Sequence, residues 1–201
     1  MAGFEALIRI CAILLGTVVL ALPVLRAVRL SLRRKAGRAS GGAASRAWPV
    51  TLLASLGLVA LGVLLWVPLP LRIDPGVRLA LSLLGALFYF PGTTLYLWAF
   101  VHLGEQFGVS SLLGAGLYRD HRLITSGPFA RLRHPMYAGV LLAALGALLI
   151  FRTWAMVFFA PMSLVVLARA EREEALLTQE FGRAWQAYAA RVSKWFPRFK
   201  H

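Results

Sequence analysis

Four polar side chains that could bind a charged ligand lie close together between two long apolar runs. Arg131, Arg133, His134 and Tyr137 all belong to the stretch from Ser126 to Gly139, which reads SGPFARLRHPMYAG. Ionisable groups are costly near hydrocarbon, so their concentration at the start of an apolar segment indicates a functional site. Arginine and histidine suit a carboxylate or a phosphate, because charge-assisted hydrogen bonds to these groups are strong.

A second polar block follows the last apolar run. Glu173 and Glu174 suit an amine or the hydroxyls of a ribose. Tyr137, Trp185 and Tyr188 suit an adenine face or an onium ion, by stacking and by cation–π attraction. Together with the cations of the first block, these groups are complementary to S-adenosylmethionine, which carries a carboxylate, an amine, a sulfonium and an adenosine. Two polar clusters that bracket one apolar hairpin predict a binding pocket.

Other kinds of site find less support. Gly114 and Gly116 begin like a dinucleotide-binding loop, but Arg119 stands at the third glycine position and no strand precedes them. No metal site is predicted, because the histidines lack carboxylate or cysteine partners at ligand spacing. The histidines are His102, His121, His134 and His201. The single cysteine, Cys11, lies inside an apolar run and reads as a small buried hydrophobe.

The composition is that of a membrane protein. Of the 201 residues, 59% are hydrophobic, and the mean hydropathy is +0.71, which is rare for a soluble domain. The net charge of +14 is concentrated between the apolar runs. Basic residues in such places mark cytoplasmic loops that face anionic lipid, and we therefore expect no nucleic-acid partner. We expect one polytopic membrane domain over residues 1–201.

Hydropathy predicts five membrane segments. They are Phe4 to Val28, Trp48 to Leu71, Arg78 to Leu103, Met136 to Phe151 and Thr153 to Ala168. Residues 1–103 would hold three spans, and residues 104–201 a cofactor-binding loop, a helical hairpin and a C-terminal helix. The last two segments are shorter than the roughly 20 residues of a full span. With only Arg152 charged between them, they should form a tight hairpin, either in thinned bilayer or with polar extensions at their inner ends.

Positive charge predicts the topology. Basic residues are concentrated after the first segment, between the third and fourth, and after the fifth, and these regions share one side if there are five spans. That side would be the cytoplasm, with the N-terminus outside and the C-terminus inside. The fold would be all-α, with an amphipathic cytoplasmic helix after the last span. The basic residues of the opposite side are Arg9, Arg72, Arg78 and Arg152.

Several of these features have structural explanations as well. Gly139, Ala143 and Ala147 recur every four residues, and such a small-residue ridge lets a neighbouring helix approach closely. Arg131 and Arg133 could be inside-positive anchors, and His134 could cap a helix. The two glutamates could pair with arginines along their own helix. The aromatic residues near the C-terminus could lie at the membrane interface without binding a ligand. They are Trp185, Tyr188 and Trp195.

The segment from His121 to Gly139, with its Arg-His-Pro-x-Tyr element, resembles the core of the isoprenylcysteine carboxyl methyltransferase family. The segment from Glu173 to Val192, with its Glu-Glu, Phe-Gly and aromatic pair, resembles the same family. Related phospholipid N-methyltransferases share the general layout. The match follows the C-terminal half of the chain in order and spacing, whereas the first two spans match only as hydrophobic segments.

The resemblance implies an integral-membrane, S-adenosylmethionine-dependent methyltransferase that acts on a small apolar or lipid-like acceptor and releases S-adenosylhomocysteine. It further implies a cofactor pocket on the cytoplasmic side of a bacterial or archaeal plasma membrane. The implied cofactor-binding residues are Arg133, His134, Tyr137, Glu173, Glu174, Trp185 and Tyr188. The implied catalytic residues are Arg133, Glu174 and Tyr96.

Tyr96 marks a departure from the family pattern. The segment from Tyr96 to Gly104 resembles a family segment that often carries, at this position, an arginine implicated in handling the substrate carboxylate. An aromatic ring cannot replace that charge, so an amine or thiol acceptor is expected over a prenylcysteine carboxylate, unless Arg122 or Arg131 supplies the cation. The alternatives are a phospholipid or amine N-methyltransferase and a non-catalytic membrane protein whose basic loops bind anionic lipid or a partner.

Overall fold

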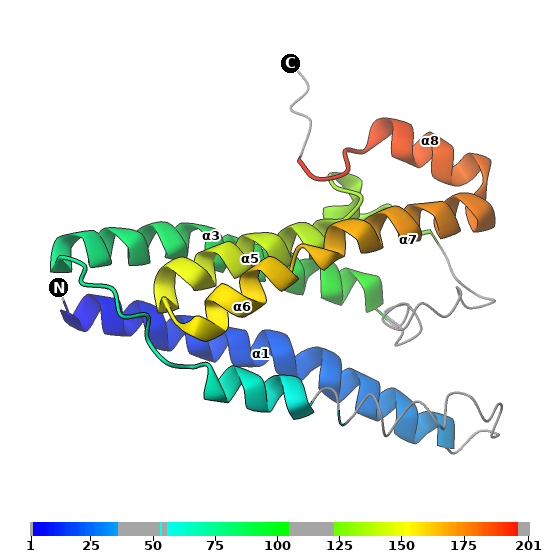
Figure 1. Cartoon of the computed structure of the whole chain (residues 1–201). Helices are drawn as coiled ribbons and strands as arrows, with labels where there is room; N and C mark the ends of the chain where they lie inside the picture. Colours follow the sequence, from blue (N-terminus) through cyan, green and yellow to red (C-terminus); the bar gives the residue numbers. More distant parts are fainter. Residues whose placement is uncertain (1, 36–52, 54–55, 105–122, 197–201) are drawn as a thin grey trace.

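The computed structural model describes residues 2–35, 53, 56–104 and 123–196, and this part of the chain is helical apart from loops and two isolated β-bridges (Figure 1). Residues 56–64 are helical and are followed by an extended segment. The named elements are α1 (Ala2–Lys35), α3 (Pro75–Leu103), the 3-10 helix η2 (Gly127–Ala130), α5 (Pro135–Phe151), α6 (Trp154–Met162), α7 (Val165–Phe181) and α8 (Arg183–Arg191).

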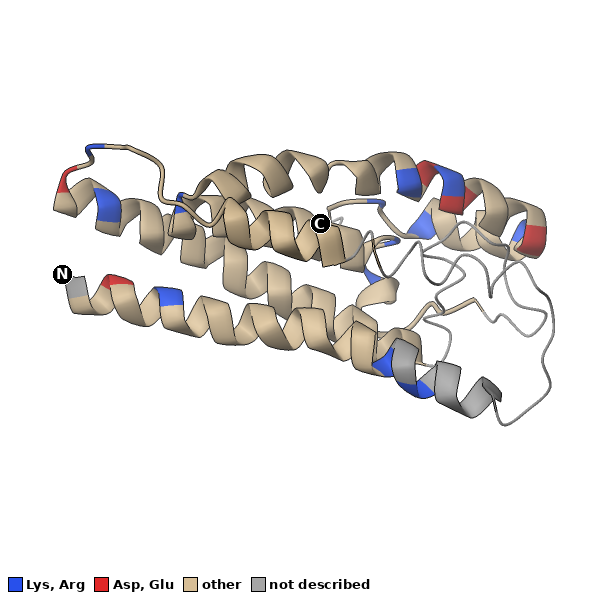
Figure 2. Cartoon of the chain, turned by 60° about the horizontal axis from the view of Figure 1, so that its bottom comes forward, with Lys and Arg blue, Asp and Glu red and all other residues tan. Residues whose placement is uncertain are grey.

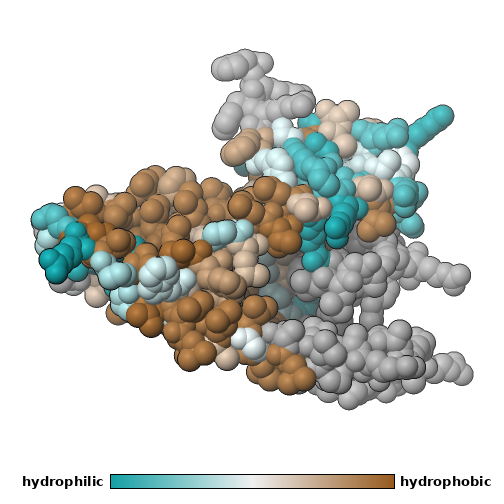
Figure 3. Space-filling model, viewed as in Figure 1, coloured by the Kyte–Doolittle hydropathy of each residue, from teal (hydrophilic) through white to brown (hydrophobic). Residues whose placement is uncertain are grey.

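Three helical stretches among the described residues are long and apolar enough to cross a membrane. They are Gly3–Arg26, Pro75–Leu103 and Trp154–Phe181, and the shorter α5 is also apolar. Figure 3 shows a hydrophobic surface over these helices, with hydrophilic residues at the two ends of the molecule. The all-α fold is confirmed for the described residues, and three of its helical stretches are candidate membrane spans. The number of spans and their orientation stay predictions, because most of residues 48–55 lie outside the described part.

The end of the second predicted segment is not helical, so its predicted boundary at Leu71 was wrong. The helix stops at residue 64, and an extended stretch follows. There Pro68 forms an antiparallel bridge with Thr153, and the Leu69 amide donates to the Arg152 carbonyl at 2.8 Å. Pro68 and Pro70 have no N–H to continue a helical ladder. The backbone therefore pairs with the turn between α5 and α6 instead.

The hairpin predicted around Arg152 is present, but its second arm differs from the prediction. Arg152 caps α5 in the left-handed conformation, at φ 51°, and the chain reverses into α6. The predicted single span to Ala168 is broken after Met162, next to Pro161, and resumes at Val165. The chain then continues as α7 to Phe181. This is the polar extension that the sequence analysis gave as one of two alternatives for the short hairpin. This extension carries Glu173 and Glu174.

Helices α3 and α5 pack closely through glycines. A Cβ atom added at Gly139 would lie 2.6 Å from the Gly92 carbonyl oxygen and 2.8 Å from the Tyr96 backbone nitrogen. A Cβ atom added at Gly92 would lie 2.7 Å from the Ala143 nitrogen. Neither glycine can accept a side chain without moving backbone, which confirms the predicted small-residue ridge. The contact sets the distance between Tyr96 and the start of α5.

Helix α1 joins this pair through a small core. The Tyr89 hydroxyl of α3 donates a hydrogen bond of 2.8 Å to the Ala12 carbonyl of α1. Ile8, Ala147 and Ile150 pack around this contact and are buried. A hydroxyl buried among apolar side chains needs such an acceptor, because an unsatisfied donor there is costly. The bond therefore fixes the position of α1 along the axis of α3.

Candidate functional site

The loop before α5 is shaped by a glycine and two prolines. Gly127 has φ 61°, and the space of its missing Cβ is filled by the His102 ring from the end of α3. Any larger residue there would be strained and would clash. Pro128 is buried in η2, and Pro135 begins α5, where proline is well suited to the first helical turn. The loop thereby places His134 as the residue that caps α5.

A segment after α8 holds the same loop from the other side. The Arg133 amide donates to the Ser193 carbonyl at 2.8 Å, and Leu132 and Ser193 form a parallel bridge. The Trp195 ring lies 5.6 Å from the His134 ring, centroid to centroid. The backbone that carries Arg133 and His134 is therefore fixed by residues about 60 positions later in the chain. This pairing closes a long loop, and the entropy cost of closing a loop rises only slowly with its length.

Glu174 organises the cations of the site. Its Oε1 atom lies 3.0 Å from Nη1 of Arg133 and 3.0 Å from Nε2 of His134. Its Oε2 atom lies 3.4 Å from Nζ of Lys194. All four side chains are at least four-fifths buried, so these ion pairs are weakly screened and hold the groups in place. Glu174 braces Arg133 and His134 and does not line either of the described cavities.

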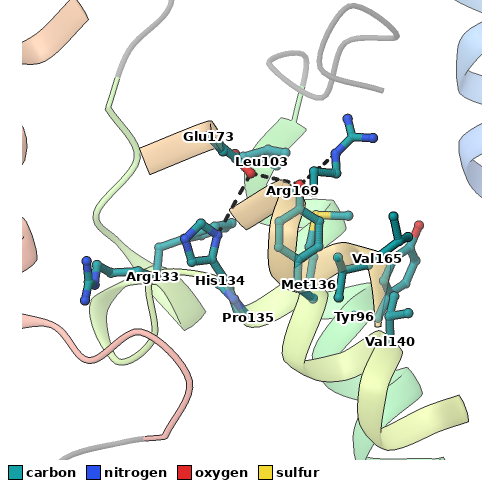
Figure 4. Close-up of a pocket in the computed structure, with 13 residues that line it drawn as sticks. Tyr96, Leu103, Arg133, His134, Pro135, Met136, Val140, Val165, Arg169 and Glu173 are labelled. Atoms are coloured by element: carbon teal, nitrogen blue, oxygen red, sulfur yellow. Dashed lines mark hydrogen bonds and ion pairs between the residues drawn. The ribbon is translucent and has the colours of Figure 1, made fainter. Parts of the chain in front are cut away.

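Glu173 belongs to a separate chain of hydrogen bonds (Figure 4). The Tyr137 hydroxyl donates to its Oε2 atom at 2.8 Å, and the same hydroxyl accepts from Nε of Arg169 at 3.0 Å. Nδ1 of His134 lies 3.9 Å from the same carboxylate oxygen. Helix α7 thus presents its two adjacent glutamates to opposite sides of one imidazole.

The imidazole of His134 is held neutral at physiological pH. Burial lowers the pKa of His134 from its usual range, and this outweighs the opposing effect of the carboxylates of Glu173 and Glu174. In the neutral ring, Nε2 carries the proton and donates to Glu174, which leaves the lone pair on Nδ1. Because the ring also stacks on Tyr137 with centroids 5.5 Å apart, its orientation is fixed.

Two cavities meet at these residues. The larger has a volume of about 290 Å³, close to the lower end of small-molecule sites, and the smaller about 50 Å³. The larger is lined by Tyr96, Leu103, Phe129, Arg133, His134, Pro135, Met136, Tyr137, Val140, Val165, Val166, Arg169 and Glu173. The smaller is lined by Leu103, Leu123, Ile124, Phe129, Arg133, His134, Glu173, Leu177, Trp185 and Tyr188. Figure 4 shows the larger one between α3, α5 and α7.

The aromatic pair of α8 lies inside the protein and not at a lipid interface. Trp185 and Tyr188 are each only 4% exposed and pack on Leu177 of α7. The Tyr188 hydroxyl donates to the Phe129 carbonyl at 2.7 Å. Burial raises the pKa of Tyr188 to about 12, so it remains a neutral donor. The interface-aromatic reading of these two residues was therefore wrong, and α8 closes the smaller cavity.

The structure brings together the eight residues that the sequence predicted as cofactor-binding or catalytic. Tyr96, Tyr137 and the Arg133–His134 pair share the larger cavity, and Glu173 lines both cavities. Arg131 is exposed, as an anchor would be. The described part of the chain has no group of side chains suited to a metal ion. Arg122 lies outside the described residues.

Three contributors to the site were not among the residues predicted as cofactor-binding or catalytic. Arg169 and Phe129 line the larger cavity, and Lys194 contacts Glu174. Arg169 is four residues before Glu173, so the helical period could have placed both on one face. Lys194 carried no local signal, because its position depends on the pairing of distant backbone segments.

Comparison with known proteins agrees with this geometry. Residues 84–179 match the model of the isoprenylcysteine carboxyl methyltransferase (ICMT) family. A protein-S-isoprenylcysteine O-methyltransferase from Schizosaccharomyces pombe is 30% identical over 101 residues. That alignment covers 49% of this chain and 42% of the yeast protein, so the chain matches less than half of its relative's length. The matched region contains α5, most of α3 and the two glutamates of α7. The chain is therefore ICMT-like, and the likeness is carried by the helices that enclose the larger cavity.

Proposed function

We propose that this protein is an integral-membrane methyltransferase that transfers a methyl group from S-adenosylmethionine to an apolar or lipid-like acceptor. The observation that carries the proposal is the junction of the two cavities at Arg133, His134 and Glu173. On one side of these polar residues lies a largely apolar cavity between helices, and on the other an aromatic one under α8. A charged ligand and an apolar ligand can therefore meet at the same side chains.

The donor set fits S-adenosylmethionine. Nε of Arg133 is buried without a hydrogen-bond acceptor, although Nη1 of the same side chain is held by Glu174. A buried donor of this kind is costly unless an acceptor arrives, and the carboxylate of the cofactor would supply one. Glu173, whose side chain is 41% exposed, would hold the ammonium group. Trp185 and Tyr188 would offer ring faces to the adenine.

The protein would act by positioning. S-adenosylmethionine supplies a methyl group activated by its sulfonium sulfur. Arg133, braced by Glu174, would fix one end of this ligand, and the packed walls of the larger cavity would hold the acceptor and exclude water. Alignment of two reactants in one site can account for several kcal/mol of the barrier. Direct transfer to a nucleophile requires little acid–base chemistry, which agrees with a neutral, immobilised His134.

The larger cavity suits an acceptor with an apolar chain. Met136, Val140, Val165 and Val166 contribute aliphatic surface to it. Tyr96 does occupy the wall of this cavity, but Arg169 lines it too. The expectation of a neutral acceptor rested on the absence of a cation here. With a guanidinium from α7 in the same cavity, we propose that a carboxylate on an apolar chain is accepted.

The membrane orientation is part of the proposal. Helix α7 carries three of the charged residues of the site, Arg169, Glu173 and Glu174, and its charged part lies towards one end of the molecule (Figure 2). The excess of basic residues in the segments nearest that end supports a cytoplasmic location for it. The cofactor would then enter from the cytoplasm and the acceptor from the bilayer.

Calorimetry with S-adenosylhomocysteine in detergent tests the cofactor, and transfer of a labelled methyl group tests the reaction. We expect stoichiometric binding, and label in an extractable apolar acceptor. A non-catalytic protein that binds anionic lipid would show neither. Binding without transfer to any offered carboxylate, amine or thiol would support the cofactor site and contradict the acceptor class.

A further inference from the structure

A second cluster of charged side chains lies at the end of the helices away from the pocket. Glu5 of α1 is 6% exposed and is shared by three arginines. Nη2 of Arg9 lies 2.9 Å from Oε1, Nε of Arg78 lies 2.8 Å from Oε2, and Nη2 of Arg152 donates to Oε1. Ser82 of α3 accepts a 3.1 Å hydrogen bond from Arg152. The cluster joins α1, α3 and the turn after α5.

The positive charge of the cluster exceeds its negative charge. Three guanidinium groups face one carboxylate, so two charges are left without a counter-ion among the described residues. Nε of Arg9 and Nε of Arg78 are buried without a hydrogen-bond acceptor. Although Nε of Arg78 is close to Glu5, its N–H is not aligned with the carboxylate. Neither Nη atom of Arg78 forms a hydrogen bond within the described part of the chain.

The two surplus arginines are accessible from outside. The side chains of Arg9 and Arg78 are 40% and 43% exposed, whereas that of Arg152 is 10% exposed. A structural tie between α1 and α5 requires only the buried pair of Arg152 and Glu5. Two further cations beside it raise the cost of charge near hydrocarbon, unless an anion is bound. Helices α1 and α3 begin at the same end of the molecule (Figure 1), and an anion would meet the two arginines near that end.

We propose that Arg9 and Arg78 form a binding site for a phosphate group, either in the headgroup of an anionic phospholipid or as the free ion. A phosphate offers several acceptor oxygens at once, and guanidinium groups bind it through paired hydrogen bonds. Glu5 and Arg152 hold the two arginines on adjacent helices, so the site is built before the ligand arrives. An apolar helix surface next to the arginines would accommodate the acyl chains of a lipid.

The test measures the melting temperature of the purified full chain in non-ionic detergent. The probes are dioctanoylphosphatidylglycerol, dioctanoylphosphatidylcholine and inorganic phosphate at matched ionic strength. We expect phosphatidylglycerol to stabilise the protein in a saturable way, well beyond phosphatidylcholine. The double variant Arg9→Gln/Arg78→Gln should bind it at least about tenfold more weakly, as for a lost hydrogen bond to a charged group. Arg72→Gln is the matched control, because Arg72 is an exposed arginine next to the start of α3.

The outcomes separate the two sources of phosphate. A full response to inorganic phosphate assigns the free ion, and a response to phosphatidylglycerol alone assigns the headgroup. Equal responses of the wild type to phosphatidylglycerol and phosphatidylcholine, together with none to inorganic phosphate, would overturn the site. An undiminished response of the double variant would place the bound anion elsewhere on the chain and would also overturn it. Where the double variant does not fold, the single variant Arg78→Gln gives the same comparison, because Glu5 keeps its ion pairs with Arg9 and Arg152.

Discussion

Nε2 of His134 lies 3.0 Å from Oε1 of Glu174, across 40 residues of sequence. The bond ties the first turn of α5 to the polar extension of α7. It also fixes the tautomer of the imidazole and, through the shared carboxylate, the guanidinium of Arg133. The pocket therefore depends on a buried network in which each member positions another, and removal of one member should affect ligand binding without direct contact.

We expect His134→Ala and Glu174→Ala each to weaken S-adenosylhomocysteine binding by about 1–3 kcal/mol, because each leaves a buried partner unsatisfied. Calorimetry measures the change, and Arg131→Ala is the control, since Arg131 is a neighbouring but exposed cation. Unchanged affinity in both folded variants would mean that the ligand does not use this network.

Stability should depend on pH through His134. Burial lowers the pKa of His134 in the folded protein, whereas in the unfolded chain it is about 6.5. As the pH falls, His134 therefore takes up a proton in the unfolded chain before it does so in the folded protein. The contribution of His134 to the free energy of unfolding is complete above about pH 6.5 and is lost as the pH falls through the pKa of the folded state. Melting temperatures at about pH 7.5 and about pH 5.5 should differ less in His134→Gln than in the wild type. An equal difference would show that His134 titrates alike in both states.

Gly139→Ala should destabilise the protein by about 1–3 kcal/mol, because the added methyl group meets backbone of α3 that must shift. The shift would also move Tyr96, so methyl transfer should fall further than stability alone explains. Gly57→Ala is the control, since nothing lies within 4 Å of a Cβ atom there. Thermal unfolding and turnover are measured together, and a neutral effect at Gly139 would mean that the two helices pack less closely than described.

The acceptor can be tested with a farnesylcysteine analogue. We expect it to be methylated, and we expect Arg169→Gln to lower kcat/KM by roughly tenfold to a hundredfold, the range for a lost hydrogen bond to a charged group. Arg172→Gln is the matched control, because Arg172 is an exposed arginine of the same helix and does not line the larger cavity. Turnover that survives Arg169→Gln would remove this residue from carboxylate binding. Transfer to an amine analogue alone would favour N-methylation.

Topology can be tested at two exposed residues of opposite ends. In a Cys11→Ser background, Arg72→Cys should react with an impermeant thiol reagent added to intact cells. Glu180→Cys should react only after the membrane is permeabilised, because α7 ends on the side with more basic residues. Reaction of both positions from the same side would contradict a molecule that crosses the membrane between them.

The sequence predicted helices from hydropathy, and these were confirmed where the signal was local. It predicted the site from residue chemistry, and that stays a prediction. The boundaries of α3 and the turn at Arg152 were close to those observed. The extended segment at Pro68 was missed, because its hydropathy is that of a span and its pairing partner is distant. Arg152 looked like a simple hairpin charge, and nothing local connects it with Glu5, which lies 147 residues earlier. Such contacts depend on how the helices pack, and this cannot be inferred from the residue pattern of one sequence alone.

Because Ser193 pairs with Arg133, the binding loop can be fixed only after the apolar helices have been synthesised. Chains leave the ribosome from their N-terminus at about 5–20 residues per second. Helices α1, α3 and α5 can therefore enter the membrane before residues 192–195 exist, and the Arg133 loop is not held until those residues arrive. A nascent chain of this protein would thus stay unable to bind its ligand firmly while its apolar helices are being inserted.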